Sequence, residues 1–134
     1  MKRLLLVLIT LVAAAGCSRE PAAGTNLNAA NKVAVRLVRL YYESPGLLLA
    51  PEPRSIPLPE SPAAAVPVVV HELMKGPAIA SSLRLFPIDT VVRGAWLLPG
   101  GTVVVDLGGP TLSRGWATGS HQEIMAAYSL VQTV

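Results

Sequence analysis

Cysteine, aromatic residues and charged residues are all scarce in this chain. Of its 134 residues, 14% are charged, 4% are aromatic and one is a cysteine. A single cysteine excludes an internal disulfide, a CxxC redox pair and a thiolate metal cluster. Hydrophobic residues make up 51%, so the composition also excludes a chain that is disordered throughout. The length allows one small domain with one core.

The basic residues are too dispersed to indicate a nucleic-acid partner. The formal net charge is +3, and without Lys2 and Arg3 of the leader about +1 remains. A phosphate-tracking groove needs basic residues that cluster with aromatic ones. In the expected domain they stand singly, and we interpret them as parts of solvated faces: Arg36, Arg39, Arg54, Lys75, Arg84, Arg93 and Arg114.

The N-terminus has the pattern of an export signal. Lys2 and Arg3 form a short cationic start, Leu4 to Val12 is an apolar run, and small residues follow before Cys17. The run is too short to span a bilayer as a mature helix, which needs about 20 apolar residues.

The tetrapeptide Ala14-Ala15-Gly16-Cys17 resembles the lipobox of bacterial lipoproteins, with Ala14 where leucine is usual. That resemblance implies a diacylglyceryl thioether on Cys17, further acyl chains such as palmitate, and cleavage just before the cysteine. The alternative is an ordinary secretory signal with an incidental cysteine. Two or three acyl chains would hold the protein on a membrane without a spanning helix.

We therefore expect three segments. Residues 1–16 are the lipoprotein signal peptide, residues 17–32 are a lipid-anchored flexible tether, and residues 33–134 are the folded domain. A tether of this length reaches about 20 Å. The expected location is the cell membrane, on its extracytoplasmic face, on the periplasmic or extracellular side.

A β-hairpin at 90–106 is expected at the centre of the domain. Two arms rich in Val, Leu and Trp flank Pro99-Gly100-Gly101, a turn sequence. On the second arm Val103, Val105 and Leu107 share one face, which helices should cover. Residues 33–42 predict a first strand. After a short return at 47–50, four prolines predict an extended loop, with at most an edge piece at 54–58.

Two helices are expected to pack on one face of this sheet. The first has Ser61-Pro62 as a start signal and Gly76-Pro77 as a stop, and it either begins near Pro67 or is kinked there. Its apolar stripe is Val66, Val70, Leu73 and Met74. The second has a predicted capping box, Ser120 with Glu123. Its apolar stripe is Ile124, Ala127, Tyr128, Val131 and Val134. The fold class is thus α/β (α+β), with a small mixed or antiparallel sheet.

Five segments in a fixed order carry a family resemblance. They are Val38–Tyr42, Leu48–Pro57 with Arg54 inside, Leu73–Pro77, Thr102–Leu107, and Gly119-Ser120 with Glu123. Together they resemble the GerMN domain of sporulation and germination lipoproteins. Gly108, where the family often has serine, and Pro67 depart from the pattern. The resemblance implies a small α/β scaffold, commonly lipid-anchored, that acts in envelope assemblies and is not known for catalysis.

The same resemblance implies that the domain is C-terminally truncated. The family continues past such a helix into one more β-strand, and the helix at 120–134 lacks the usual termination signals. We expect an unpaired sheet edge beside the 33–42 strand.

Several patterns that suggest chemistry are incomplete. His71-Glu72 begins like HExxH, but Lys75 stands at the fifth position, where the second zinc ligand would be. Ser120, His121 and Asp106 lack a GxSxG elbow, and capping explains Ser120 better. The glycines lack a phosphate-binding order, and Trp96 and Trp116 fit core or rim packing.

We therefore expect no enzyme activity, no cofactor and no metal. The favoured function is a noncatalytic lipoprotein scaffold that binds another envelope protein, through a surface that the sequence does not identify. The alternative is an envelope hydrolase or a peptidoglycan-binding lipoprotein. Asp89, Asp106 and Glu123 are the carboxylates available to a hydrolase.

Overall fold

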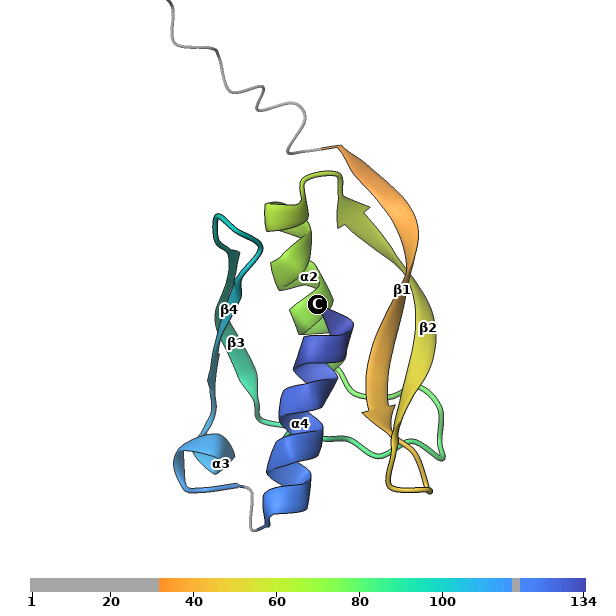
Figure 1. Ribbon diagram of the computed structural model, residues 1–134, viewed down its shortest axis with the longest axis vertical. Helices are drawn as coiled ribbons and strands as arrows, with labels where there is room; N and C mark the ends of the chain where they lie inside the picture. The colour runs from red at the N-terminus through yellow and green to blue at the C-terminus, as the bar shows by residue number, and fades with distance from the viewer. Residues whose placement is uncertain (1–31, 117–118) are drawn as a thin grey trace, which may run out of the picture.

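The domain places two helices between two β-hairpins (Figure 1). The computed structural model describes residues 32–116 and 119–134. Strands β1 (Val33–Glu43) and β2 (Leu49–Pro59) form one antiparallel sheet, and β3 (Val91–Leu97) and β4 (Val103–Gly108) form the other. Helices α2 (Pro62–Met74) and α4 (Ser120–Thr133) lie between them, and α3 (Pro110–Ser113) follows β4. The predicted α/β class is confirmed, although the strands form two sheets and not one.

The first hairpin corrects the expectation of a proline-punctuated loop, because β2 is an 11-residue strand. Backbone bonds run from the Glu60 amide to the Lys32 carbonyl and from the Ser44 amide to the Leu48 carbonyl. Directly opposite residues alternate between bonded and non-bonded pairs, so every even-numbered pair of this unbroken register is bonded. All four prolines stand at odd positions, where no amide faces β1: Pro51, Pro53, Pro57 and Pro59. Their spacing, and not their number, is what permits the strand.

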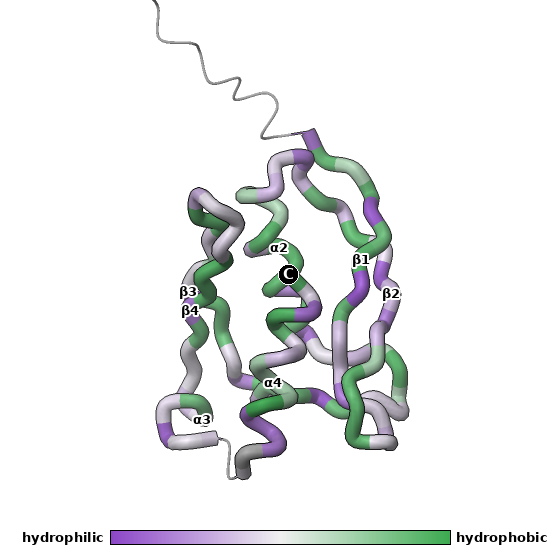
Figure 2. The backbone as a smooth tube through the Cα atoms, viewed as in Figure 1, coloured by the Kyte–Doolittle hydropathy of each residue, from purple (hydrophilic) through white to green (hydrophobic). Residues whose placement is uncertain are grey.

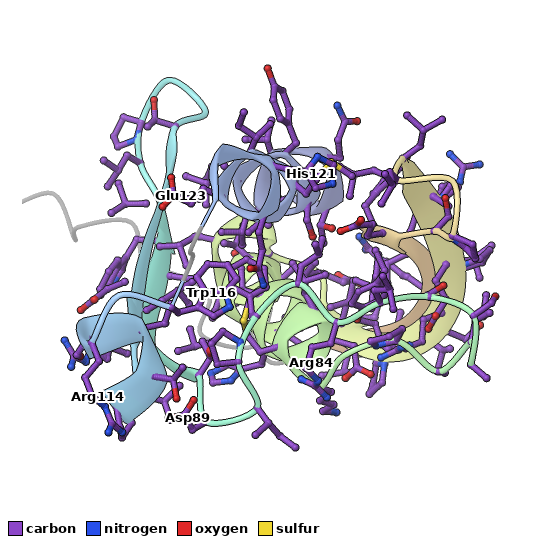
Figure 3. All side chains as sticks on the ribbon, turned by 90° about the horizontal axis from the view of Figure 1, so that it is seen from below. Arg84, Asp89, Arg114, Trp116, His121 and Glu123 are labelled. Atoms are coloured by element: carbon purple, nitrogen blue, oxygen red, sulfur yellow. The ribbon has the colours of Figure 1, made fainter. Side chains whose placement is uncertain are left out.

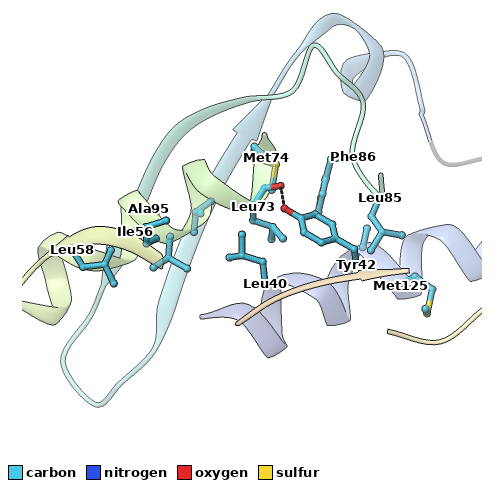
Figure 4. Packing of buried hydrophobic residues seen from close by; sticks show 13 residues of the cluster. Leu40, Tyr42, Ile56, Leu58, Leu73, Met74, Leu85, Phe86, Ala95 and Met125 are labelled. Carbon is cyan, nitrogen blue, oxygen red and sulfur yellow. Dashed lines mark hydrogen bonds between the residues drawn. The ribbon is translucent and has the colours of Figure 1, made fainter. Parts of the chain in front are cut away.

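The core lies where the inner face of this hairpin meets α2. Figure 4 shows Leu40 and Tyr42 of β1 packed beside Leu73 of α2. The Tyr42 hydroxyl donates a hydrogen bond to the Leu73 carbonyl, 3.1 Å away. The remaining buried apolar residues come from several elements: Ile56, Leu58, Val69, Val70, Met74, Leu85, Phe86, Ala95, Met125 and Ala126. The predicted inner face of α2 is confirmed, with Val66 partly buried against the same cluster.

Helix α2 begins at Pro62 and continues through Pro67, so the alternative start near Pro67 is wrong. It ends at Met74, and the chain turns away at Gly76, whose φ of 89° is a conformation that glycine adopts without strain. The Gly76 amide donates to the Leu73 carbonyl at 3.1 Å. The Arg84 guanidinium donates to the Met74 carbonyl at 2.8 Å and also to that of Lys75. A side chain from the following loop thus satisfies the carbonyls that a helix end leaves free.

The predicted hairpin at 90–106 is present, but it flanks the helices and is not central. Its inner face contributes Ala95, Val105 and Leu107 to the core. A register irregularity lies between Val92 and Gly94.

Helix α4 packs through a different face from the one predicted. Met125, Ala126 and Ser129 are buried, whereas most of the predicted stripe is more than 40% exposed: Ile124, Tyr128, Val131 and Val134. Ala127 is exposed as well. Hydrogen bonds to β1 set the orientation of the helix. The Ser129 hydroxyl donates to the Tyr41 carbonyl at 2.6 Å, and the Tyr41 amide donates to Thr133 Oγ1 at 3.2 Å. The N-cap is Gly119, and the side chain of Ser120, on which the predicted capping box depends, lies outside the described residues.

Candidate functional site

The two edges of the β1–β2 sheet differ in what they can bind. On β2 the outward-facing amide positions are the odd ones, and four of those six residues are prolines, which have no amide hydrogen. On β1 the outward-facing positions are Val33, Val35, Leu37, Arg39, Tyr41 and Glu43, all with amides. Proline protects one edge from further strand pairing, and β1 is the edge that can accept a strand.

Part of the β1 edge is already covered. The Glu43 carbonyl accepts a hydrogen bond from the Leu83 amide at 2.7 Å, and Tyr41 is bonded to Ser129 and Thr133 of α4. The outward-facing backbone groups of Val33, Val35, Leu37 and Arg39 have no partner within residues 32–116 and 119–134. We call these four residues the open edge.

Apolar surface surrounds the open edge. Val35 is 73% exposed and Leu37 is 68% exposed, far more than a strand with a covered face shows. In Figure 2 hydrophobic residues alternate with hydrophilic ones along β1 and also line α2 and α4. On α4 the displaced stripe forms a second exposed strip, the α4 apolar row, made of Ile124, Tyr128, Val131 and Val134.

Three hollows lie along the contact of α4 with the first hairpin. The largest, about 420 Å³, is lined by Leu37, Val38, Arg39, Tyr41, Gln132 and Thr133. A second, about 370 Å³, lies between Leu48 and Tyr128. A third, about 230 Å³, has Arg36 on one side and Val66, Val69 and Val134 on the other. All three are lined by residues of the open edge, the α4 apolar row or their neighbours.

Arg54 forms a half-buried ionic cluster that corrects its interpretation as a solvated residue. Its Nη1 lies 3.0 Å from Glu72 Oε1, and its Nη2 donates to Glu52 and, at 3.1 Å, to the Gly76 carbonyl. Glu52 also accepts from the amides of Ala78 and Ile79. Arg54 thereby ties together two segments of the predicted family pattern, Leu48–Pro57 and Leu73–Pro77.

The pKa values of this cluster are consistent with charged groups throughout. Burial by itself raises the pKa of Glu52, but hydrogen bonds from Arg54, Ala78 and Ile79 hold it below its usual value. Burial likewise opposes the lowering of the pKa of Glu72, which hydrogen bonds from Lys75 and Arg54 produce. Glu72 is therefore an ion-pair partner and not solvated helix polarity. Sequence reasoning missed the cluster, although Glu52 and Arg54 share the inward row of β2 with Ile56 and Leu58.

The structure does not assemble the predicted catalytic groups into one site. Asp89 and Glu123 lie on opposite sides of the molecule in Figure 3, and Asp106 is exposed on β4. Asp89 Oδ2 accepts from the Thr111 amide and hydroxyl, both at 2.9 Å. These bonds, the amide first, lower the pKa of Asp89.

The histidine and tryptophan residues considered in the sequence lie at different places in the structure. His71 is exposed, and His121 Nε2 lies 3.3 Å from Glu43 Oε1. Trp116 stacks on Phe86 with ring centroids 5.8 Å apart, which agrees with its predicted packing role, whereas Trp96 is 51% exposed. Among the described residues no three His, Cys, Asp or Glu side chains converge as metal ligands would.

The predicted lipidation site, Cys17, and the lipobox residues Ala14, Ala15 and Gly16 lie outside the described residues. So do the signal peptide and all of the tether except Lys32. None of the helices within residues 32–116 and 119–134 has the length and apolarity needed to cross a membrane.

Comparison with known protein families identifies the family to which the chain belongs. Residues 39–134 match the Germane family, described as sporulation and spore germination. Since the match covers more than half of the sequence, the chain belongs to this family, which confirms the resemblance to GerMN domains. Membership implies a role related to sporulation or germination. No curated protein and no solved structure matches the chain.

Proposed function

We propose that this protein is a noncatalytic, lipid-anchored docking protein of the cell envelope that binds another protein during sporulation or germination. The observation that carries the proposal is the exposed apolar surface formed by the α4 apolar row and the outer face of β1. On α4 Val131 is 68% exposed and Tyr128 is 56% exposed, and on β1 Leu37 is 68% exposed. Exposed apolar surface of this kind is typical of interaction sites.

Three further points support the proposal. Two of the carboxylates that a hydrolase would need, Asp89 and Glu123, lie on opposite sides of the molecule. The leader and Cys17 supply a membrane anchor, and the tether lets the domain stand off the lipid surface. The family description names a developmental process and not a reaction.

The docking part of the proposal is tested by site-specific photocrosslinking in the native host. A crosslinker at Val131 should give an adduct of one discrete mass during sporulation, and the same crosslinker at Val104 should not. Val104 is a matched control because it is also an exposed valine, on the outer face of β4 at 42% exposure. Tyr128→Asp, in the same apolar row, should remove the adduct formed by the crosslinker at Val131 and reduce spore formation or germination. Equal crosslinking from both positions contradicts a specific surface.

The anchor and the absence of catalysis have their own tests. Cys17→Ala should remove lipid label from the protein and release it from the membrane fraction, or leave the precursor uncleaved. Unchanged lipid-labelled membrane fractionation contradicts the anchor. Degradation of peptidoglycan by the purified chain, lost in a folded Asp106→Asn variant, contradicts the noncatalytic role.

A further inference from the structure

We propose that the outer face of the β3–β4 hairpin binds a glycan chain of acetamido sugars, such as the glycan of peptidoglycan. Such a site goes beyond the proposed docking function, because it gives the domain a second ligand on a different face. Three side chains form it, and we call them the outer strip: Trp96, Arg93 and Asp106. The helices lie between this hairpin and β1 (Figure 1), so the outer strip is remote from the edge where the family resemblance predicts a further strand.

The Trp96 indole forms an aromatic platform on this face. Its neighbour Ala95 is buried in the core, so the side chain of Trp96 points outward, and it is 51% exposed. The six-membered ring of the indole lies over Gly94, in the space that a Cβ at that position would occupy. Gly94 thus permits one side of the ring to rest on the sheet while the other side is open to solvent. An aromatic ring held in this way is available for stacking.

A guanidinium and a carboxylate lie next to this platform. Arg93 stands at the register irregularity between Val92 and Gly94, and its guanidinium lies over Gly108 as the indole lies over Gly94. Asp106 is exposed and lies directly opposite Gly94 in the register. Positions 106 and 108 of β4 are about 7 Å apart. Within residues 32–116 and 119–134 neither Arg93 nor Asp106 forms an ion pair, so both groups are available to a ligand.

An acetamido sugar complements the outer strip. The face of an aromatic ring carries negative partial charge, and the C–H bonds on the face of a pyranose ring carry positive partial charge, so the two stack. A carboxylate only accepts hydrogen bonds, and a guanidinium only donates them. Because Asp106 and Arg93 are not paired with each other, they suit a group that has its donor and its acceptor on separate atoms. The acetamido group is of this kind, with its N–H directed to Asp106 and its carbonyl to Arg93.

Two other classes of ligand fit the outer strip less well. A nucleic acid would bring phosphate groups close to the Asp106 carboxylate, and like charges repel. An apolar segment of a protein would remove Arg93 and Asp106 from water without giving either one a partner. The three hollows described above, which suit apolar side chains better, are lined by other elements.

The test titrates soluble chitin oligosaccharides, which are chains of N-acetylglucosamine, into the full chain in a detergent without a sugar headgroup. Cellooligosaccharides are the matched control, because they have the same ring and linkage but no acetamido groups. We expect the chitin ligand to bind and to shift the indole N–H resonance of Trp96, but not that of Trp116, which is stacked on Phe86. Equal binding of the two ligands overturns the acetamido chemistry. Absence of chitin binding, or an unshifted Trp96 resonance, overturns the proposal.

Gly94→Ala tests the platform and keeps the indole. The added Cβ would meet the Trp96 ring and lift it from the sheet, and Gly94 does not have a positive φ, so alanine fits the backbone. Gly94→Ala and Trp96→Leu should each weaken chitin binding roughly tenfold or more, whereas Trp96→Phe, which keeps an aromatic face, should lose less. Thermal unfolding checks that each variant is folded. Chitin binding by a folded Trp96→Leu or Gly94→Ala variant that equals the wild type overturns the proposal.

An arginine pair tests the polar contacts. Arg93→Met should weaken chitin binding roughly threefold to tenfold. Arg114→Met removes the same charge from an exposed residue outside the outer strip and should change binding less than about twofold. Equal losses in the two variants overturn the assignment of Arg93. Retained crosslinking at Val131 in a protein that binds no chitin would contradict the glycan site and leave the docking function standing.

Discussion

Replacement of Arg54 by methionine should be among the most destabilising single changes in this domain. The Arg54 side chain is 18% exposed, and its partners Glu52 and Glu72 are 5% and 14% exposed. Removing the guanidinium leaves both carboxylates and the Gly76 carbonyl without their shared donor. Breaking a buried ion pair from one side costs about 3 to 5 kcal/mol.

The structure favours the lower end of that range. Glu52 keeps two backbone donors, Ala78 and Ile79, and Glu72 keeps Lys75 at 2.5 Å. We therefore expect Arg54→Met to lower the free energy of unfolding by about 3 kcal/mol, a large fraction of the roughly 5 to 15 kcal/mol of a small domain. For a domain of about 100 residues this corresponds to a fall in Tm of roughly 12 to 24 °C.

The assay is urea and thermal unfolding of the purified chain, followed by circular dichroism. Arg36→Met is the matched control, since Arg36 lies on a strand but is exposed, and its stability should stay within about 0.5 kcal/mol of wild type. A double-mutant cycle with Glu52→Gln should give a coupling of about 1 to 2 kcal/mol. A midpoint for Arg54→Met equal to that of Arg36→Met would refute the reasoning.

Three further outcomes are expected from unfolding measurements. The pKa values of Glu52 and Glu72 are lowered on folding, so their contribution to stability is complete above about pH 4.5 and is lost as the pH falls through their folded values. A Glu52→Gln variant should therefore lose less stability than the wild type as the pH falls below about 4.5, and an equal loss in both proteins would contradict this. Gly76→Ala should cost about 1 to 2 kcal/mol, because φ is 89° and a Cβ would overlap Arg84; thermal unfolding that matches wild type would contradict this. Tyr42→Phe should cost about 1 kcal/mol through the hydroxyl bond to Leu73. Burial raises the pKa of Tyr42 to about 12, so the wild type should also lose stability as the pH rises from about 10 through 12, and this loss should be absent in the phenylalanine variant.

Local signals in the sequence were sufficient for several elements. Ser61-Pro62 and Gly76-Pro77 marked the two ends of α2, and its stripe of Val70, Leu73 and Met74 is the buried face. The turn at 99–101 marked the second hairpin. These features depend on one or two residues at a time, so sequence reasoning can find them.

Features that depend on the relation between distant segments were missed. Each proline of β2 by itself predicts a break in a strand, whereas the odd position that all four share permits the strand. The face of α4 was chosen by apolarity, yet its orientation is set by hydroxyls of Ser129 and Thr133 that satisfy the backbone of Tyr41. Buried backbone groups require partners, and no pattern within the helix shows which strand needs them. The open edge was expected from family resemblance, and its exact extent required the structure. The predicted truncation and the predicted anchor stay predictions.

The prolines of β2 also constrain how the first hairpin can misfold. A register slip by one residue would move four residues without amides into positions where the ladder needs donors: Pro51, Pro53, Pro57 and Pro59. The same slip would turn the inward row of Glu52, Arg54, Ile56 and Leu58 toward solvent. In the slipped register each of these prolines would leave a carbonyl of β1 without a donor. In the native register the prolines face away from β1, so no hydrogen bond of the ladder is missing. In natural variants of this chain we expect new prolines in β2 to be confined to odd positions, of which Leu49 and Ser55 are not yet proline.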